Sequence, residues 1–237
     1  MTSLSTSPSS APSALSAPIV LFDLDGTLTD SAPGIVAGIR HAYGALGLPV
    51  PDDATLRSFV GPPITASFPA HGVPADRVDE AVRAYREVFA AGGMYDNRVF
   101  DGIPDVLRAL RAAGCTLAVA TSKPEVYARP ICDRFGLTEL VDDVFGAPLD
   151  EGTSTKADVI AKALAALGRT SPVDPADGPA LMVGDREHDV HGAAAHGIRC
   201  LGVTWGYAAP GELEGAGAAA LVDDVADLAD AVLARLG

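Results

Sequence analysis

The sequence has no apolar run that approaches the roughly 20 residues needed to span a bilayer, so a membrane protein is not expected. Cysteine is scarce: the 237 residues include three, Cys115, Cys132 and Cys200, an odd number without paired spacing. A disulfide framework is therefore not expected, and small apolar packing is the simplest role for these side chains. Such cysteine usage is typical of a reducing cytoplasm, which is the location that we expect.

Positive charge is also scarce, since 17 Lys and Arg face 31 Asp and Glu, for a formal net charge of −14. A polyanion would be repelled at long range, so a nucleic acid is not an expected partner. A small anionic substrate would need local cations to bind it. The Ala-rich helices can pack internally or against a second copy, which leaves a monomer and a homodimer both open.

The first 17 residues consist mostly of Ser, Ala, Pro and Thr. They contain no basic residue and no long apolar segment, and in this they differ from a signal peptide or a transit peptide. We interpret residues 1–17 as a disordered tail. With 48% hydrophobic residues overall, the rest of the chain has enough apolar side chains for a sizeable core.

One stretch, IVLFDLDGTLTD at residues 19–30, looks like a buried strand that ends in a site. Four apolar residues precede Asp23, Asp25 follows two residues later, and Gly26 lets the backbone turn sharply. Two carboxylates so close together repel each other unless a cation neutralises them. Oxygen ligands favour a hard divalent cation, and Mg²⁺ is the expected one. The alternative is an ordinary Asx turn at the surface, because Asp and Gly are common turn residues.

Apolar periodicity divides the rest of the chain into two parts. Residues 32–98 show helical or loop-like patterns and no strand pattern. From residue 99 onward, strand and helix patterns alternate, which indicates βαβ units and a parallel sheet covered on both faces. We therefore predict an α/β fold whose core consists of residues 18–31 and 99–237, with an all-helical insertion at 32–98. The predicted strands are at 19–22, 115–120, 141–145, 180–183, 199–203 and 220–222.

Polar side chains follow several of these predicted strands. In a parallel sheet the carboxyl ends of the strands meet at one edge, where ligands bind. The residues expected to join Asp23 and Asp25 at this edge are Thr121, Ser122, Lys156 and Asp185. Taken singly, each has an ordinary explanation: a hydroxyl can cap a strand end, a lysine can be a solvated helix residue, and an acid can begin a helix.

This set of groups suits phosphoryl transfer. Asp23 is placed to attack phosphorus and form an aspartyl-phosphate, which splits one difficult hydrolysis into two easier steps. Asp25 can protonate the leaving oxygen and later activate water. We expect Mg²⁺, held by Asp23 and Asp185, to neutralise part of the phosphoryl charge. The Lys156 ammonium and the Thr121 hydroxyl would neutralise the rest.

The same positions resemble the four motifs of the haloacid dehalogenase superfamily of phosphatases. In motif order, the matching residues are Asp23-Leu24-Asp25-Gly26-Thr27, Thr121, Lys156, and Gly184-Asp185 with Asp189. The resemblance implies a Rossmann-like core in which Asp23 is the nucleophile and Asp25 the acid and base. It implies that Mg²⁺ is held by the Asp23 side chain, the Asp25 backbone carbonyl and Asp185, with Asp189 in support. The insertion at 32–98 would be the family's small cap, which closes over the site.

Within the superfamily, the chain is similar to the phosphoglycolate phosphatase branch and more closely to its bacterial 5′-nucleotidase-like members. The residues behind this finer resemblance include Phe59-Val60-Gly61-Pro62-Pro63 and Gly184-Asp185-Arg186-Glu187-His188-Asp189-Val190. The expected phosphate-binding residues are Thr121, Ser122 and Lys156, and the candidates for contact with the rest of the substrate are Gly61, Arg57 and Lys123. The sequence does not decide between phosphoglycolate and a nucleoside 5′-monophosphate.

Two other activities stay open. A sugar-phosphate phosphomutase could use the same scaffold. A phospho-accepting signalling domain also places acids, a hydroxyl and a lysine around Mg²⁺ at strand ends. Such domains are much shorter, however, and lack both an acid equivalent to Asp25 and an inserted cap. Hydrolysis of a small phosphorylated metabolite is therefore the leading prediction.

Overall fold

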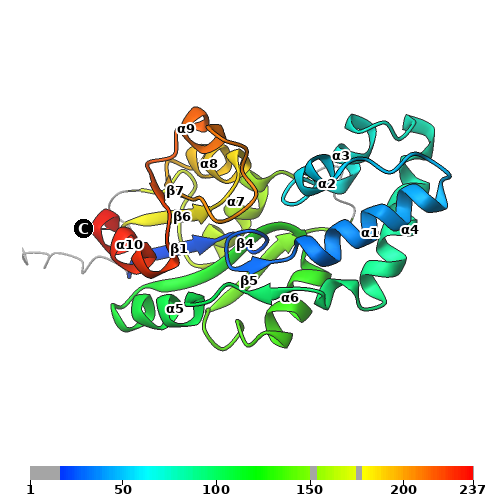
Figure 1. The fold of residues 1–237 in the computed structure, drawn as a ribbon. Helices are drawn as coiled ribbons and strands as arrows, with labels where there is room; N and C mark the ends of the chain where they lie inside the picture. The colour runs from blue at the N-terminus through cyan, green and yellow to red at the C-terminus, as the bar shows by residue number, and fades with distance from the viewer. Residues whose placement is uncertain (1–16, 150–153, 175–177, 237) are drawn as a thin grey trace, which may run out of the picture.

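The computed structural model describes residues 17–149, 154–174 and 178–236 (Figure 1). Apart from Ala17, the predicted disordered tail lies outside the described residues. The strands are β1 (Ile19–Phe22), β2 (Thr29–Asp30), β3 (Arg98–Val99), β4 (Thr116–Pro124), β5 (Asp143–Ala147), β6 (Ala180–Gly184), β7 (Arg199–Val203) and β8 (Ala220–Val222). The helices are α1 (Ala32–Ala45), α2 (Asp53–Ser58), α3 (Ile64–Ala70), α4 (Val78–Ala90), α5 (Ile103–Ala112), α6 (Glu125–Arg134), α7 (Lys156–Ala166), α8 (Glu187–Ala194), α9 (Glu212–Ala216) and α10 (Leu228–Leu236).

Six strands form one parallel sheet in the order β5-β4-β1-β6-β7-β8. β1 lies in the interior of the sheet, with Ile19 opposite Thr116 of β4 and Ala180 of β6. A strand that has neighbours on both sides and helices on both faces is buried along its whole length. This position explains the all-apolar run of β1, whose four residues are at most 2% exposed.

Alternate residues of β1 contribute to two different apolar clusters. Val20 and Phe22 belong to the cluster that includes residues of α5, α6 and α10, whereas Ile19 and Leu21 belong to the cluster that includes residues of α7 and α8. The alternation follows from the two-residue period of a strand. Figure 1 shows α7 and α8 above the sheet and α5 and α6 below it. The predicted α/β fold with a parallel sheet is confirmed.

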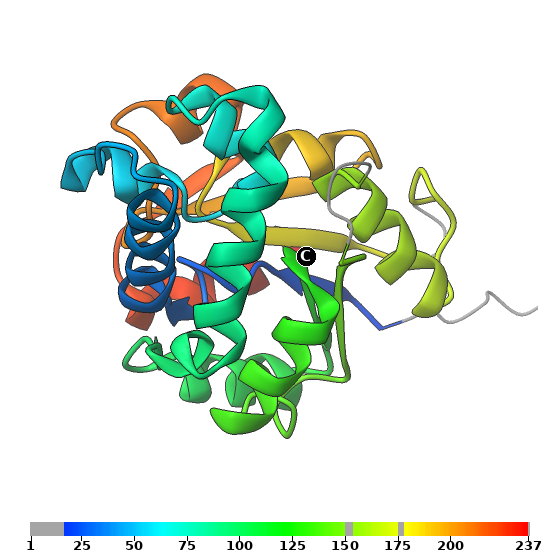
Figure 2. The same cartoon turned by 90° about the vertical axis from the view of Figure 1, so that its right-hand side faces the viewer.

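Residues 32–98 contain α1 to α4 and lie beyond one end of the sheet (Figure 1), so that α1 and α4 face the viewer in Figure 2. Two short strands at the junctions, β2 and β3, pair antiparallel, with Thr29 opposite Val99. The sequence did not indicate this ribbon, because two residues are too few to show a strand period. The division into a core and a helical insertion stays a prediction. Among the described residues, no helix is both long and apolar enough to cross a membrane.

β4 is longer than its sequence pattern indicates. The predicted strand ends at residue 120, whereas β4 continues to Pro124 and so includes Thr121 and Ser122. Its pairing with β5 shifts register between Thr121, opposite Gly146, and Pro124, opposite Ala147. Such an irregularity bends a strand and redirects its side chains. Thr121 therefore lies within the sheet and not, as predicted, just after a strand end.

Glu125, the first residue of α6, ties three elements together. Its carboxylate lies 2.6 Å from Lys162 Nζ of α7 and 3.0 Å from Arg129 Nε, and it accepts a hydrogen bond from the Gly146 amide of β5. Burial alone would raise the pKa of Glu125, but these contacts outweigh burial and lower the pKa from 4.5 to about 2. The ionised carboxylate therefore stabilises the fold fully above pH 4.5, and this contribution is lost as the pH falls through about 2.

We expect Glu125→Gln to lower the free energy of unfolding at pH 7 by about 1 kcal/mol, a modest value because solvent screens a partly exposed carboxylate. Denaturant unfolding at pH 7 and pH 3 would measure the effect, and the difference from wild type should shrink at the lower pH. Glu139→Gln, at an exposed residue before β5, is the matched control. A difference that is equal at both pH values would contradict a stabilising charge on Glu125.

Candidate active site

The two acids of the first motif are buried directly after β1. Asp23 and Asp25 are 4% and 5% exposed. The Leu24 amide donates to Asp23 Oδ1 at 2.8 Å, which orients the first carboxylate. Gly26 turns the chain with a φ of +82°, and a Cβ at this position would lie 2.2 Å from Asp185 Oδ2. The turn therefore needs glycine both for its left-handed backbone and for the close approach of a third carboxylate.

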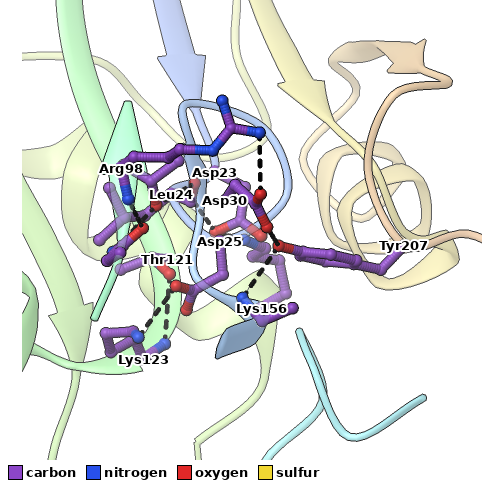
Figure 3. A network of polar contacts seen from close by, with 12 residues as sticks. Asp23, Leu24, Asp25, Asp30, Arg98, Thr121, Lys123, Lys156 and Tyr207 are labelled. Atoms are coloured by element: carbon purple, nitrogen blue, oxygen red, sulfur yellow. Dashed lines mark hydrogen bonds and ion pairs between the residues drawn. The ribbon is translucent and has the colours of Figure 1, made fainter. Parts of the chain in front are cut away.

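Lys156 reaches this site from the first turn of α7. Its Nζ lies 2.8 Å from Asp23 Oδ1, and Figure 3 labels both residues. The same Nζ lies 2.7 Å from Asp189 Oδ1 and donates to the Ala120 carbonyl at 2.9 Å. A capping box that begins at Thr155 fixes the start of the helix. Burial alone would lower the pKa of Lys156, but Asp189 and Asp23 outweigh it and raise the pKa. The side chain is therefore held as an ammonium ion.

Asp185 and Asp189 complete a cluster of three carboxylates with Asp23. One oxygen from each lies within 4.8 Å of the others, and both added acids are 0% exposed. Thr27 Oγ1 donates to Asp185 Oδ1 at 3.2 Å, and the Tyr207 amide donates to Asp185 Oδ2 at 2.8 Å. Burial, together with the charges of Asp189 and Asp23, raises the pKa of Asp185 well above its usual value. Burial also raises the pKa of Asp189, to about 6.

This carboxylate cluster fits a divalent cation. Three buried acids repel one another, and the single ammonium group of Lys156 offsets only part of their charge. Burial is the main cause of the raised pKa values of Asp185 and Asp189, and the negative charge of Asp23 adds to it. An all-oxygen donor set is what hard cations such as Mg²⁺ prefer. The Asp25 carboxylate is not part of the cluster, and ligation through the Asp25 backbone carbonyl stays a prediction.

The Asp25 carboxylate contacts a second lysine. Lys123 Nζ lies 2.9 Å from Asp25 Oδ1 and 4.9 Å from the centre of the Phe89 ring of α4. The Lys123 amide donates to Thr121 Oγ1 at 3.2 Å (Figure 3). The irregular end of β4 thus brings a hydroxyl and an ammonium group to the same side of the site.

Asp25 lines a cavity whose empty volume is about 430 Å³ when the space at its opening to solvent is included. Its polar lining includes Ser122 and Lys123 of β4. Its other side is formed by residues of the 32–98 segment, which include Ile35, Phe59, Gly61, Ile64, Tyr85 and Phe89. A cavity lined by both polar and apolar side chains is typical of small-molecule sites. The structure therefore brings Gly61, Ser122 and Lys123 to the edge of one cavity.

Arg57, a predicted substrate contact, lies outside this cavity. It lines a different surface pocket, together with Asp30, Arg40 and Asp53. Its guanidinium carbon lies 5.8 Å from the centre of the Tyr207 ring. A role of Arg57 in substrate binding stays a prediction. The described contact of its side chain is with Tyr207 and not with the cavity at Asp25.

Tyr207 is a site residue that the sequence patterns did not indicate. Its hydroxyl donates to Asp30 Oδ1 at 2.8 Å and accepts from the Ala32 amide at 3.1 Å, while its own amide contacts Asp185 (Figure 3). Asp30 is in turn paired with Arg98 of β3. A signal was present, because Tyr207 closely follows β7 and the ends of parallel strands share one edge.

Comparison with known families agrees with this geometry. The sequence model of the family described as haloacid dehalogenase-like hydrolase matches residues 20–203. This span runs from β1 to the end of β7. It contains the carboxylate cluster, the second acid and both buried lysines described above.

The relatives of this chain are named for different activities. The tyrosine-protein kinase PtkA of Mycobacterium tuberculosis is 47% identical over 189 residues, which are 80% of this chain but 62% of the length of PtkA. A 5′-nucleotidase of Pseudomonas aeruginosa is 43% identical over 201 residues, covering 84% of this chain and 88% of that protein. Phosphoglycolate phosphatase 1 of the same species is 29% identical over 197 residues, covering 80% of this chain and 70% of that protein.

A solved structure shows the same fold. A protein from Clostridium acetobutylicum, described as a predicted phosphatase, is 40% identical with a TM-score of 0.84, covering 93% of this chain and 100% of that one. The resemblance stated from the motifs is thus confirmed, including its phosphoglycolate phosphatase and 5′-nucleotidase members. The chain belongs to the haloacid dehalogenase-like hydrolase family.

Proposed function

We propose that this phosphatase hydrolyses small phosphomonoesters in two steps, through an aspartyl-phosphate on Asp23. The observation that carries the proposal is the position of Asp23 in a buried carboxylate cluster, with Lys156 Nζ 2.8 Å away. A phosphoryl group that reaches this point meets a fixed positive charge. Asp25, which lies two residues further along the chain and is paired with Lys123, supplies a carboxyl group with a separate environment.

Asp23, Asp25 and one water molecule supply all the bonds and protons that the two steps require. The Leu24 amide and Lys156 both contact Oδ1 of Asp23, so we assign the attack on phosphorus to Oδ2. As this bond forms, the bond from phosphorus to the leaving oxygen breaks, and the leaving oxygen takes the proton of the Asp25 carboxyl group. The Asp25 carboxylate then removes a proton from water, whose oxygen bonds to phosphorus. The bond to Asp23 breaks, which releases inorganic phosphate and restores both acids.

Thr121, Ser122 and Lys156 are the proposed phosphate-binding residues. Thr121 is 1% exposed and Lys156 is 6% exposed, so both groups are fixed by packing before a substrate arrives. Such preorganised donors cost little reorganisation when charge develops on the phosphoryl oxygens. Lys123 is proposed to orient Asp25 and to border the leaving group.

The proposed ligands of Mg²⁺ are Asp23, Asp185 and the backbone carbonyl of Asp25, with Asp189 in support. When bound, Mg²⁺ would supply neutralising charge for the phosphoryl group. Asp189 contacts Lys156 and accepts a hydrogen bond from the Arg186 amide at 3.0 Å. These contacts favour a role for Asp189 in orienting the ligands over direct ligation.

We also propose that residues 32–98 act as a cap on a core made of residues 18–31 and 99–237, with β2 and β3 as the connections. The cavity at Asp25 is lined from both parts, so the leaving group would touch both. Phosphoglycolate and nucleoside 5′-monophosphates are both candidate substrates, since Lys123 suits a carboxylate and the aromatic lining suits a base. A cytoplasmic location and a monomeric or homodimeric state complete the proposal.

Phosphate release from a substrate panel tests this function. The panel contains phosphoglycolate, nucleoside 5′-monophosphates, sugar phosphates and pyrophosphate, each assayed with Mg²⁺ and with EDTA. We expect removal of the metal to lower the rate about a hundredfold or more, because a bound cation supplies several kcal/mol of charge stabilisation. A rate that EDTA does not change would contradict the metal assignment, and the absence of release from every compound would contradict hydrolysis.

The identity with PtkA favours a second candidate function, phosphoryl transfer to tyrosine. Incubation with ATP labelled at the γ-phosphate, a tyrosine-containing peptide and Mg²⁺ would test it. Labelled phosphotyrosine would support this candidate, whereas labelled inorganic phosphate alone would support hydrolysis. An isomeric sugar phosphate formed from the panel would indicate a phosphomutase. A stable phosphorylated Asp23 without turnover would indicate a signalling domain.

A further inference from the structure

The loop between α2 and α3, Phe59–Pro63, borders the cavity at Asp25 and is held by an arginine from the other side of the site. Phe59, Gly61, Pro62 and Pro63 of this loop line the cavity. Arg186 follows Asp185 directly in the chain, and its Nη1 donates to the Val60 carbonyl at 2.6 Å across a separation of 126 residues. The loop is therefore tied to the segment that carries a carboxylate of the cluster.

Arg186 is itself held in place. Its Nε donates to Glu212 Oε1 at 2.8 Å, and both side chains are 11% exposed. The Glu212 carboxylate, in α9, also accepts from the amides of Glu187 and Ala209, at 3.0 Å and 2.9 Å. The Glu212 carboxylate is itself fixed by two backbone amides, so the Arg186 guanidinium group that it binds has little conformational freedom. Arg186 Nη1 is therefore already in position to donate to the Val60 carbonyl.

The loop is shaped to fit this arginine. Gly61 has a φ of +106°, and a Cβ on it would lie 3.1 Å from Arg186 Cγ. Next to it, Phe59 and Val60 are 1% and 0% exposed, and the Phe59 ring packs edge-on against Phe68 of α3 at a centroid distance of 5.6 Å. The loop is therefore fixed to its own helices through Phe59 and to the sheet side of the site through Arg186.

We propose that Arg186 is a positioning residue for substrate selectivity. By holding the Val60 carbonyl, it sets the position of the Phe59–Pro63 loop and hence the shape of the cavity that receives the leaving group. This inference rests on the proposed phosphatase function. Arg186 acts through the loop, so its loss affects discrimination among leaving groups more than the reaction at phosphorus, which Asp23 and Asp25 carry out.

Arg186→Met tests the proposal, because it keeps an aliphatic stem against Gly61 and removes both side-chain hydrogen bonds. We expect kcat/KM for the best substrate to fall roughly tenfold, chiefly through KM. For methyl phosphate, which has the smallest leaving group, kcat/KM should change less, so the selectivity ratio falls. Arg186→Lys should restore only part of the ratio, since an ammonium group does not reproduce the two-donor geometry. Hydrogen exchange of the backbone amides of Phe59, Val60 and Gly61 should become faster in Arg186→Met than in wild type.

Arg111→Met is the matched control. Arg111, in α5, also bridges a backbone carbonyl, that of Glu139, and a carboxylate, that of Asp142. This variant should leave both the selectivity ratio and the exchange of the loop unchanged. Thermal unfolding checks the fold of each variant. If Arg186→Met does not fold, Glu212→Gln keeps the arginine but loosens its anchor, and the same two readouts should shift in the same direction.

The outcomes separate this inference from the proposed function. An active Arg186→Met enzyme with an unchanged selectivity ratio overturns the inference, and so does unchanged exchange in the loop. If the wild-type enzyme releases phosphate from no member of the panel, the proposed function fails and the selectivity role fails with it. The exchange measurement then still decides whether Arg186 holds the loop.

Discussion

Asp23→Asn is expected to abolish phosphate release, with kcat lowered by about 10³-fold or more and the fold retained. Asparagine matches aspartate in shape, but its neutral amide is a poor nucleophile. The Asp23 carboxylate is oriented by the Leu24 amide and by Lys156, so the group that is lost is already fixed for attack. Steady-state phosphate release from the best substrate, with Mg²⁺ present, measures the effect.

The matched control for this variant is Asp105→Asn. Asp105 lies in the first turn of α5, and its side chain is 85% exposed. The control should have wild-type activity, and thermal unfolding of both variants shows whether their folds are intact. A folded Asp23→Asn protein with activity close to wild type would contradict the assignment of Asp23 as the nucleophile.

Lys156→Met is expected to cause the largest loss of stability, about 3–5 kcal/mol in the free energy of unfolding at pH 7. The methionine stem fills similar space, but Asp23 and Asp189 lose the ammonium group that lies 2.8 Å and 2.7 Å from them. Two buried carboxylates are then left without their partner. Denaturant unfolding at pH 7 measures the loss, and phosphate release should fall with it because Lys156 is also a proposed phosphate ligand.

The pH dependence of this effect has a definite sign. The pKa of Lys156 is raised in the folded protein, so its contribution is complete below the usual lysine pKa of 10.5 and is lost only as the pH rises through the higher folded value. The wild type therefore has the full contribution at pH 7. Lys156 lowers the pKa of Asp189, which is about 6 in the wild type, so this pKa should be higher in Lys156→Met, and protonation of Asp189 then relieves the repulsion. The difference in the free energy of unfolding between the two proteins should therefore narrow as the pH falls from 7 towards 6.

Added Mg²⁺ supplies an independent readout. If the carboxylate cluster binds the cation, Mg²⁺ should raise the unfolding midpoint of Lys156→Met, because a ligand that binds only the folded state stabilises it. Lys162→Met is the matched control, since Lys162 lies on the same helix with its side chain 54% exposed. Its loss should cost less than about 1 kcal/mol. Equal stability of Lys156→Met and wild type at pH 7 would contradict the assigned charge balance.

Local sequence was sufficient to place the candidate residues on elements. The apolar run before Asp23 and the turn at Gly26 indicate a buried strand that ends at the ligand edge, and β1 has this form. The apolar residues before Asp185 indicate β6 in the same way. The polar residues Thr121 and Ser122 were less informative, because β4 continues through them with a shift of register.

Contacts between the candidate residues were not predictable from local patterns. Nothing in the spacing indicates that Lys123 pairs with Asp25 while Lys156 lies between Asp23 and Asp189. The hydrogen bond from Arg186 to the Val60 carbonyl joins two segments that are 126 residues apart, and no sequence pattern of either segment indicates the other. Tyr207 also acquires its contacts with the site only through the fold.

The sequence by itself determined where the apolar strands and helices lie and which polar residues stand at or near the ends of strands, and therefore which chemistry the chain can carry. Only the tertiary structure decided which of these residues are neighbours. The reason is that periodicity reports the burial of each side chain along its own helix or strand, which is a local property. Neighbourhood depends on the strand order β5-β4-β1-β6-β7-β8, which is set by how the helices and crossovers pack over the whole sheet.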